Sequence, residues 1–78
     1  MYVYLLESIS CPDRHYVGIT KDLETRLSSH NAGQVLSTSK FRPWAFTVTC
    51  WFKETSKARK FEKYLKSGSG RAFSKRHF

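Results

Sequence analysis

Two short runs decide the fold: Tyr2-Val3-Tyr4-Leu5-Leu6-Glu7 and His15-Tyr16-Val17-Gly18-Ile19-Thr20. Both are rich in aromatic and β-branched residues, which favour strands. Between them, Cys11-Pro12-Asp13 has the composition of a turn. The two runs therefore predict an antiparallel hairpin, because strand side chains alternate between faces. One face is expected to carry Val3, Leu5, Val17 and Ile19, and the other Tyr2, Tyr4 and Tyr16.

A first helix is expected to follow the hairpin over residues 21–31. Thr20 can act as its N-cap, and Gly33 is placed for a left-handed stop after its last turn. Arg26 and His30 are spaced i, i+4, so they share one flank of this helix beside its apolar stripe. Two polar groups are thus predicted at the edge of the core.

A third strand is expected over residues 44–52, after a polar segment without a clear period. Its residues alternate between apolar and mixed positions, which predicts one strongly apolar face. That face is expected to carry Phe46, Val48, Cys50 and Phe52.

A second helix is expected after Glu54-Thr55, ending at Gly68 and Gly70. Its apolar stripe consists of Ala58, Phe61 and Leu65. Glu62 lies about 70° from the centre of that stripe, so its carboxylate borders the core and needs a partner. Residues 71–78 form a basic, aromatic tail that is too short to classify by periodicity.

These elements predict an α+β domain spanning residues 1–78, with a small three-stranded antiparallel β-sheet flanked by α-helices. The chain has 78 residues, 40% of them hydrophobic and 15% aromatic, enough for one core. Cys11 and Cys50 form no C-x-x-C pair, and no run has the length of a membrane span. We therefore expect a cytoplasmic protein with reduced thiols and no membrane partner.

The net charge of +8 favours a polyanionic partner, because lysine and arginine side chains placed against phosphates release condensed counterions. The alternative is that the basic residues form only a solvated surface. Two cysteines and three scattered histidines give no recognisable set of zinc ligands. Composition thus indicates nucleic acid but does not identify a reaction.

The motifs resemble those of the GIY-YIG nuclease family, most closely its stand-alone single-domain bacterial members. Tyr2-Val3-Tyr4 stands where the family carries Gly-Ile-Tyr, and Tyr16-Val17-Gly18 stands where it carries Tyr-Ile-Gly. Leu23-x-x-Arg26 with His30-Asn31 resembles the arginine motif of its first helix. Ala58-x-x-x-Glu62-x-x-Leu65-Lys66 resembles its glutamate helix. Each motif is weak alone, but four in this order are much more specific.

The resemblance implies a metal-dependent endonuclease that hydrolyses phosphodiester bonds, of DNA in preference to RNA, through an activated water. One Mg²⁺ or Mn²⁺ ion would be held chiefly by Glu62, a ligand type that Mg²⁺ accepts. Arg26 would bind phosphate and stabilise transition-state charge. Tyr4 and Tyr16 would orient or deprotonate the water, and His30 would be a second base or a phosphate contact.

Each of these residues also has a purely structural interpretation. Glu62 can pair with Lys66 or Arg59, and Arg26 with Asp22 or Glu24. Tyr4 can be an ordinary strand aromatic, and His30 a packing or capping residue.

Residues outside the catalytic set are expected to contact nucleic acid by charge and stacking. They are Arg42, Trp44, Lys60, Lys63, Lys66 and Arg71. An accessory protein is a further possible partner, as a supplier of targeting. Two features depart from the family pattern: Tyr2 replaces a glycine, and no asparagine follows Glu62. A non-catalytic nucleic-acid-binding module and a basic protein that docks on a ribonucleoprotein therefore remain alternatives.

Overall fold

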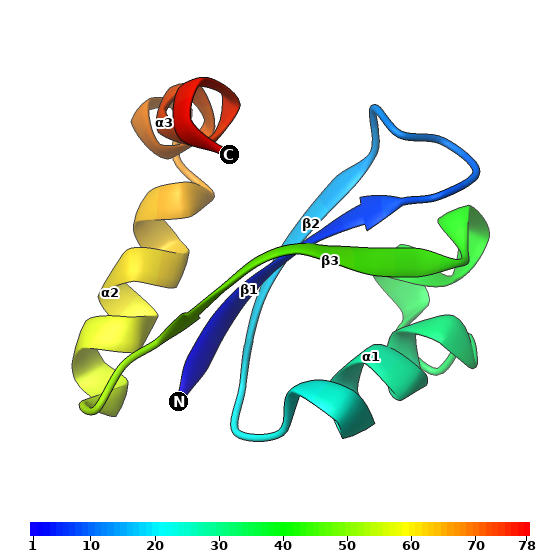
Figure 1. Ribbon diagram of the computed structural model, residues 1–78, viewed down its shortest axis with the longest axis horizontal. Coiled ribbons are helices and arrows are strands. Elements are labelled where there is room, and N and C mark those ends of the chain that lie inside the picture. The colour runs from blue at the N-terminus through cyan, green and yellow to red at the C-terminus, as the bar shows by residue number, and fades with distance from the viewer.

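The structure is a computed structural model that describes all 78 residues. Its centre is a three-stranded antiparallel sheet, in which β1 (Tyr2–Ser8) lies between β2 (His15–Thr20) and β3 (Trp44–Trp51). Helices flank this sheet on both sides (Figure 1). The predicted α+β class and sheet are therefore confirmed.

The hairpin has the predicted register on one face of the sheet. Val3 lies opposite Ile19, and Leu5 lies opposite Val17. These side chains pack against α2 (Thr55–Leu65), where they form a core cluster with its buried residues. Burial of this face fixes the register, since a shift by one residue would expose every apolar side chain of the hairpin.

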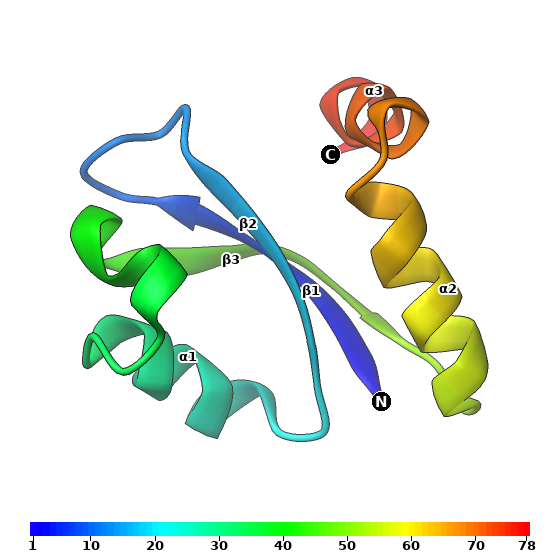
Figure 2. The same ribbon diagram turned by 180° about the vertical axis from the view of Figure 1, so that it is seen from behind.

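The opposite face of the sheet forms a second core cluster. Tyr4, Leu6 and Trp44 are buried there, and α1 (Leu23–Asn31) packs over them through its leucines. A short 3₁₀ helix, η1 (Leu36–Phe41), adds Phe41 to this cluster. The sheet therefore separates α1 and η1 from the C-terminal helices, as the two opposite views show (Figures 1 and 2).

Phe46 does not lie on the predicted face of the sheet, because β3 contains a β-bulge. Leu5 pairs with Val48 and Leu6 with Phe46, so Thr47 has no partner on β1. The extra residue reverses the alternation of side chains. Val48 packs with the α2 cluster, whereas Phe46 packs with Tyr4 on the other face.

The first helix begins two residues later than predicted, because Asp22 caps it instead of Thr20. The Asp22 carboxylate accepts hydrogen bonds from the Thr25 backbone N–H at 3.1 Å and from its hydroxyl at 3.0 Å. These bonds satisfy a backbone donor that the first turn leaves free and hold the pKa of Asp22 below its usual value. Gly33 has a φ of 79°, in agreement with its predicted role as a left-handed stop.

The basic tail folds into a third helix that was not predicted, α3 (Gly68–His77). The Ser67 hydroxyl caps it by accepting a hydrogen bond from the Gly70 N–H at 3.1 Å. Gly70 packs so closely on the backbone of Tyr64 and Leu65 that a Cβ atom would overlap it. Gly68 and Gly70, predicted to end the second helix, therefore lie in the first turn of α3, whereas α2 ends earlier, at Leu65. A membrane-spanning helix needs about 20 mostly apolar residues, and no helix here satisfies that requirement.

Candidate active site

A hydrogen-bonded group of side chains connects the central strand to the first helix. The Tyr4 hydroxyl lies 2.8 Å from Nε2 of His30, and Nε of Arg26 donates to the same hydroxyl at 3.2 Å. β1 directs Tyr4 toward α1, and the i, i+4 spacing places Arg26 and His30 on the helix flank that faces it. Arg26 and His30 of the first helix, both predicted site residues, thus contact Tyr4, a predicted site residue of the central strand.

The 3₁₀ helix extends this network. Nδ1 of His30 lies 2.8 Å from the Thr38 hydroxyl, which donates to the Val35 carbonyl at 3.3 Å. Tyr4 and His30 are both 0% exposed, and Thr38 is 1% exposed. The network is therefore sealed from solvent, except where Arg26 continues it to the half-buried surface.

Burial controls the protonation of the network. It lowers the pKa of His30 to about 4, with a further contribution from the Arg26 cation. Burial also raises the pKa of Tyr4, although its hydrogen bond with Arg26 acts in the opposite direction. That same hydrogen bond raises the pKa of Arg26. At neutral pH the imidazole and the phenol are therefore uncharged beside one fixed cation.

Tyr16 lies on the solvent side of this network. Its ring meets the His30 ring edge-on with centroids 4.9 Å apart, and its centroid is 6.3 Å from that of Tyr4. The side chain is half-buried and reaches the surface beside α2 and α3. Of the two motif tyrosines, Tyr16 is therefore the one that a substrate can touch directly.

Glu62 lies on α2 at the border of the core and forms an ion pair. Its carboxylate is 3.0 Å from the Lys66 ammonium, with side chains 21% and 52% exposed, respectively. Glu62 is also among the charges that raise the pKa of Tyr4, so it acts on the Tyr4–Arg26 network electrostatically. A pair with Lys66 is the purely structural interpretation that the sequence offered for Glu62, and the structure contains this pair. An ion pair this exposed contributes about 0–1 kcal/mol, so it is easily exchanged for another partner.

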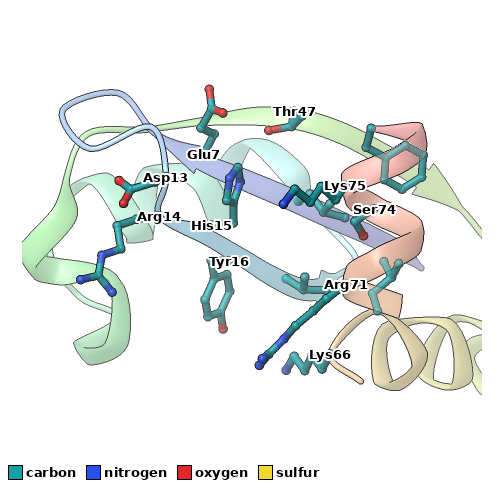
Figure 3. A pocket seen from close by; sticks show the side chains of 14 residues that line it. Glu7, Asp13, Arg14, His15, Tyr16, Thr47, Lys66, Arg71, Ser74 and Lys75 are labelled. Atoms are coloured by element: carbon teal, nitrogen blue, oxygen red, sulfur yellow. The ribbon is translucent and has the colours of Figure 1, made fainter. Parts of the chain in front are cut away.

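A groove of about 960 Å³ runs from Tyr16 across the outer part of the sheet beneath α3. Tyr16, Lys66 and Arg71 lie together at one end, and His15 and Lys75 lie farther along it (Figure 3). Two carboxylates, Glu7 and Asp13, line the groove beyond His15. Its positive end therefore lies next to the half-buried tyrosine.

Comparison with known protein families identifies the domain. The family model of the GIY-YIG catalytic domain matches the sequence over residues 1–76. The chain belongs to the GIY-YIG family. GIY-YIG proteins are nucleases, so a nucleic acid is the substrate that family membership implies. No curated protein and no solved structure matches the chain.

The cationic residues predicted for nucleic-acid contact occupy different parts of this GIY-YIG domain. Lys66 lies about 40° from Glu62 around the α2 axis, whereas Lys60 lies about 160° away. Lys63 is intermediate, at about 100°. Arg42 lies at the end of η1, where its guanidinium packs against Gly33 and its Nε donates to the Ser39 carbonyl at 2.9 Å. Lys66 and Arg71 are thus brought to the candidate site, and Lys60 and Arg42 are not.

The prediction that Trp44 stacks on nucleic acid is contradicted by its burial. The side chain is 3% exposed and packs with Tyr4 and Leu6. Its indole N–H donates to the Thr38 carbonyl at 2.8 Å. Stacking on a base requires a free ring face, which a tryptophan in the core lacks. An alternating strand pattern with an aromatic residue at its first position does not distinguish these two environments.

Three residues near the GIY-YIG site acquire a role that the sequence analysis missed. Gly18 packs against the Tyr4 phenol, and a glycine inside a strand is a signal for such a close approach. The Asn31 side chain accepts from the Trp44 N–H at 2.7 Å and donates to its carbonyl at 3.1 Å. It thereby ties the end of α1 to the start of β3. Thr38 contacts His30, and no sequence pattern in the polar segment between α1 and β3 indicated this role.

Proposed function

We propose that this GIY-YIG domain is a metal-dependent endonuclease that hydrolyses phosphodiester bonds of DNA. The observation that carries the proposal is the adjacency of the Tyr4–Arg26–His30 network, the accessible Tyr16 and the cationic end of the groove. Such a site offers a phosphate-binding fork, a hydroxyl for water and a cationic path for the strand. A domain that only binds nucleic acid does not need the buried part of this network.

Arg26 is proposed to hold the scissile phosphate. Its Nε already donates to Tyr4, so the terminal guanidinium nitrogens remain for contacts outside the core. A planar guanidinium fixed at one end presents its other donors in a defined direction, which favours two-pronged phosphate binding. Because it is preorganised, it can also stabilise the charge that develops during bond cleavage.

Tyr16 is proposed to orient the attacking water. Its half-buried side chain lines the groove, whereas Tyr4 and His30 are closed off from it. Because burial raises the pKa of Tyr4, that phenol stays protonated at neutral pH and does not remove a proton. Tyr4 and His30 therefore act from behind, by holding Arg26 and Tyr16 in place.

Glu62 is proposed to hold one Mg²⁺ or Mn²⁺ ion. No group of three or more His, Cys, Asp or Glu side chains gathers in the structure, so the protein would supply at most two such ligands, of which Glu62 is the proposed one. That suits Mg²⁺, which takes one or two carboxylates and completes its coordination with waters and substrate phosphate. When bound, the ion supplies Lewis-acid stabilisation of the phosphoryl and leaving oxygens. The half-exposed Lys66 ammonium must move aside for it.

The groove is proposed to guide the strand by charge rather than by reading its sequence. Lys66 and Arg71 suit phosphates, and contacts with phosphates carry no sequence information. Targeting would then come from the structure of the substrate or from an accessory protein. We place this activity in the cytoplasm, where the free thiols of Cys11 and Cys50 would stay reduced.

One observation favours a second function, a non-catalytic nucleic-acid-binding module. The Glu62 carboxylate is already neutralised by Lys66, so the domain can approach a polyanion without a metal ion. Under this alternative, nucleic acid binds equally well with and without divalent cations, and no product forms.

The two functions are separated by a cleavage and binding assay. Labelled single-stranded, duplex and branched DNA, and the matching RNAs, are incubated with the protein in Mg²⁺, Mn²⁺ or EDTA. We expect cleavage of DNA only with a metal ion, and loss of cleavage but not of binding in Glu62→Ala. Glu54→Ala is the matched control, because Glu54 is an exposed carboxylate that pairs with Lys57 at the start of the same helix. Full activity of Glu62→Ala would contradict the proposed metal ligand.

A further inference from the structure

The protons of the buried network can be placed from its hydrogen-bond partners. The Arg26 Nε–H donates to the Tyr4 oxygen, so the phenolic proton must point elsewhere. The only other polar atom in hydrogen-bonding contact with that hydroxyl is Nε2 of His30, at 2.8 Å. Since Tyr4 is 0% exposed, no solvent can accept this proton. The phenol is therefore satisfied only if Nε2 is an unprotonated acceptor.

An unprotonated Nε2 requires the proton of the neutral imidazole on Nδ1. Nδ1 faces the Thr38 hydroxyl at 2.8 Å, and that hydroxyl donates its own proton to the Val35 carbonyl at 3.3 Å. The hydroxyl oxygen is thus free to accept from Nδ1–H. With this arrangement every donor from Arg26 to Thr38 has an acceptor, whereas the opposite tautomer leaves the buried Tyr4 O–H without one.

We propose that Thr38 is a positioning residue, which fixes His30 as the Nδ1–H tautomer and thereby directs the Tyr4 hydroxyl so that its lone pairs hold Arg26. Thr38 touches neither the groove nor Arg26, so it acts only through His30. Thr38 belongs to η1, which places its hydroxyl beside His30. The Thr38 carbonyl also accepts a hydrogen bond from the Trp44 indole N–H, which anchors this part of η1 to the core. The polar segment between α1 and β3 is thus part of the site.

This proposal rests on the proposed function only for its effect on rate, because the tautomer itself can be measured without substrate. The ring nitrogens of ¹⁵N-histidine-labelled protein are observed by NMR at pH 7 in wild type, Thr38→Ser and Thr38→Val. We expect wild type and Thr38→Ser to carry the His30 proton on Nδ1. Thr38→Val keeps the branched shape but removes the acceptor of Nδ1–H, so each tautomer then leaves one buried donor unpaired, and we expect part of the His30 population to carry its proton on Nε2.

The same variants are compared for cleavage at saturating substrate and for KM. Thr38→Val is expected to lower kcat by about ten- to hundredfold, as removal of a supporting hydrogen bond does at other sites, with little change in KM. Thr38→Ser is expected to restore most of the rate. Thr49→Val on β3 is the control, because it makes the same chemical change at an exposed residue.

A wild-type His30 that carries its proton on Nε2 would overturn the proposal, even if Thr38→Val did not fold. So would a folded Thr38→Val with an unchanged tautomer and rate. An altered tautomer in a protein that cleaves no substrate would support the role of Thr38 and contradict the proposed nuclease function instead.

Discussion

Gly18 of β2 lies so close to the Tyr4 phenol that a Cβ atom at residue 18 would overlap the hydroxyl oxygen and the ring. The two residues are direct partners in the hairpin, so the contact follows from the strand register. Gly18→Ala must therefore displace the phenol from Arg26 and His30. We expect a loss of about 1–3 kcal/mol in the free energy of unfolding, as for other overpacked sites, and a clear fall in kcat.

Urea denaturation and single-turnover cleavage measure these two effects. Gly68→Ala is the control, because a Cβ at Gly68 meets no atom within 4 Å. Its stability should remain within about 1 kcal/mol of wild type. Equal behaviour of the two alanine variants would show that the Gly18–Tyr4 contact is not needed.

Arg26→Lys keeps the charge but loses the Nε–H that donates to Tyr4 and the flat fork beyond it. Removal of one preorganised donor typically costs about 2.7–4 kcal/mol in the barrier, so we expect kcat to fall by about 10²–10³. Steady-state kinetics test this, with Arg76→Lys on the exposed surface of α3 as the control. A rate equal to wild type in Arg26→Lys would reduce Arg26 to a structural role.

The buried His30 makes stability depend on pH in a defined window. Its pKa is lowered to about 4 in the folded protein, compared with about 6.5 in an unfolded chain. Between these values the unfolded state binds more protons, so the free energy of unfolding decreases as the pH falls from 6.5 to 4. The loss attributable to His30 is at most about 3 kcal/mol.

This pH effect is isolated as the difference between wild type and His30→Gln in urea denaturation at pH 7, 5.5 and 4. His77→Gln, at an exposed residue of α3, serves as the control. We expect the wild type to lose more stability than His30→Gln over this range. Parallel curves would mean that His30 can be protonated in the folded state near its ordinary pKa.

The two sides of α2 should contribute differently to nucleic-acid affinity. Lys66 and Lys63 lie about 40° and 100° from Glu62 around the helix axis, whereas Lys57 and Lys60 lie about 140° and 160° away. Each phosphate contact contributes about −0.7 on single strands, or −0.9 on duplex, to the slope of log K against log salt. Lys63→Ala/Lys66→Ala should therefore flatten the slope by about one to two units.

Lys57→Ala/Lys60→Ala removes the same charge from the same helix and should leave the slope nearly unchanged. Fluorescence anisotropy between low and moderate salt measures both pairs on one labelled oligonucleotide. If both pairs flattened the slope equally, the domain would attract nucleic acid through its overall charge and not through the side that carries Glu62.

Much of this architecture could be predicted from local pattern. The hairpin register followed from Val3, Leu5 and their partners, because a half-buried strand repeats every two residues. The meeting of Arg26 and His30 followed from helix spacing. Only the resemblance to the family motifs predicted that Glu62 and Tyr16 belong to one site, since no local pattern relates α2 to β2.

Other features depended on tertiary packing. Phe46 fits the alternating pattern of the third strand, but the bulge places it on the opposite face. Both faces of the sheet are covered, so this change of face does not expose an apolar group. Gly70 has the same sequence signal whether it ends a helix or lets two helices touch. Thr38 meets His30 through a 3₁₀ turn whose polar residues carry no periodic pattern.

We expect the bulge in β3 also to limit association between copies of the protein at high concentration. β3 is an edge strand, and Trp44–Trp51 contains no charged residue to discourage another strand from adding to it. The unpaired Thr47 interrupts the regular spacing of backbone donors and acceptors and increases the local twist, which disfavours intermolecular pairing. Deletion of Thr47 would straighten this edge, so the shortened chain is expected to form soluble oligomers or fibres at concentrations where the full chain stays monomeric.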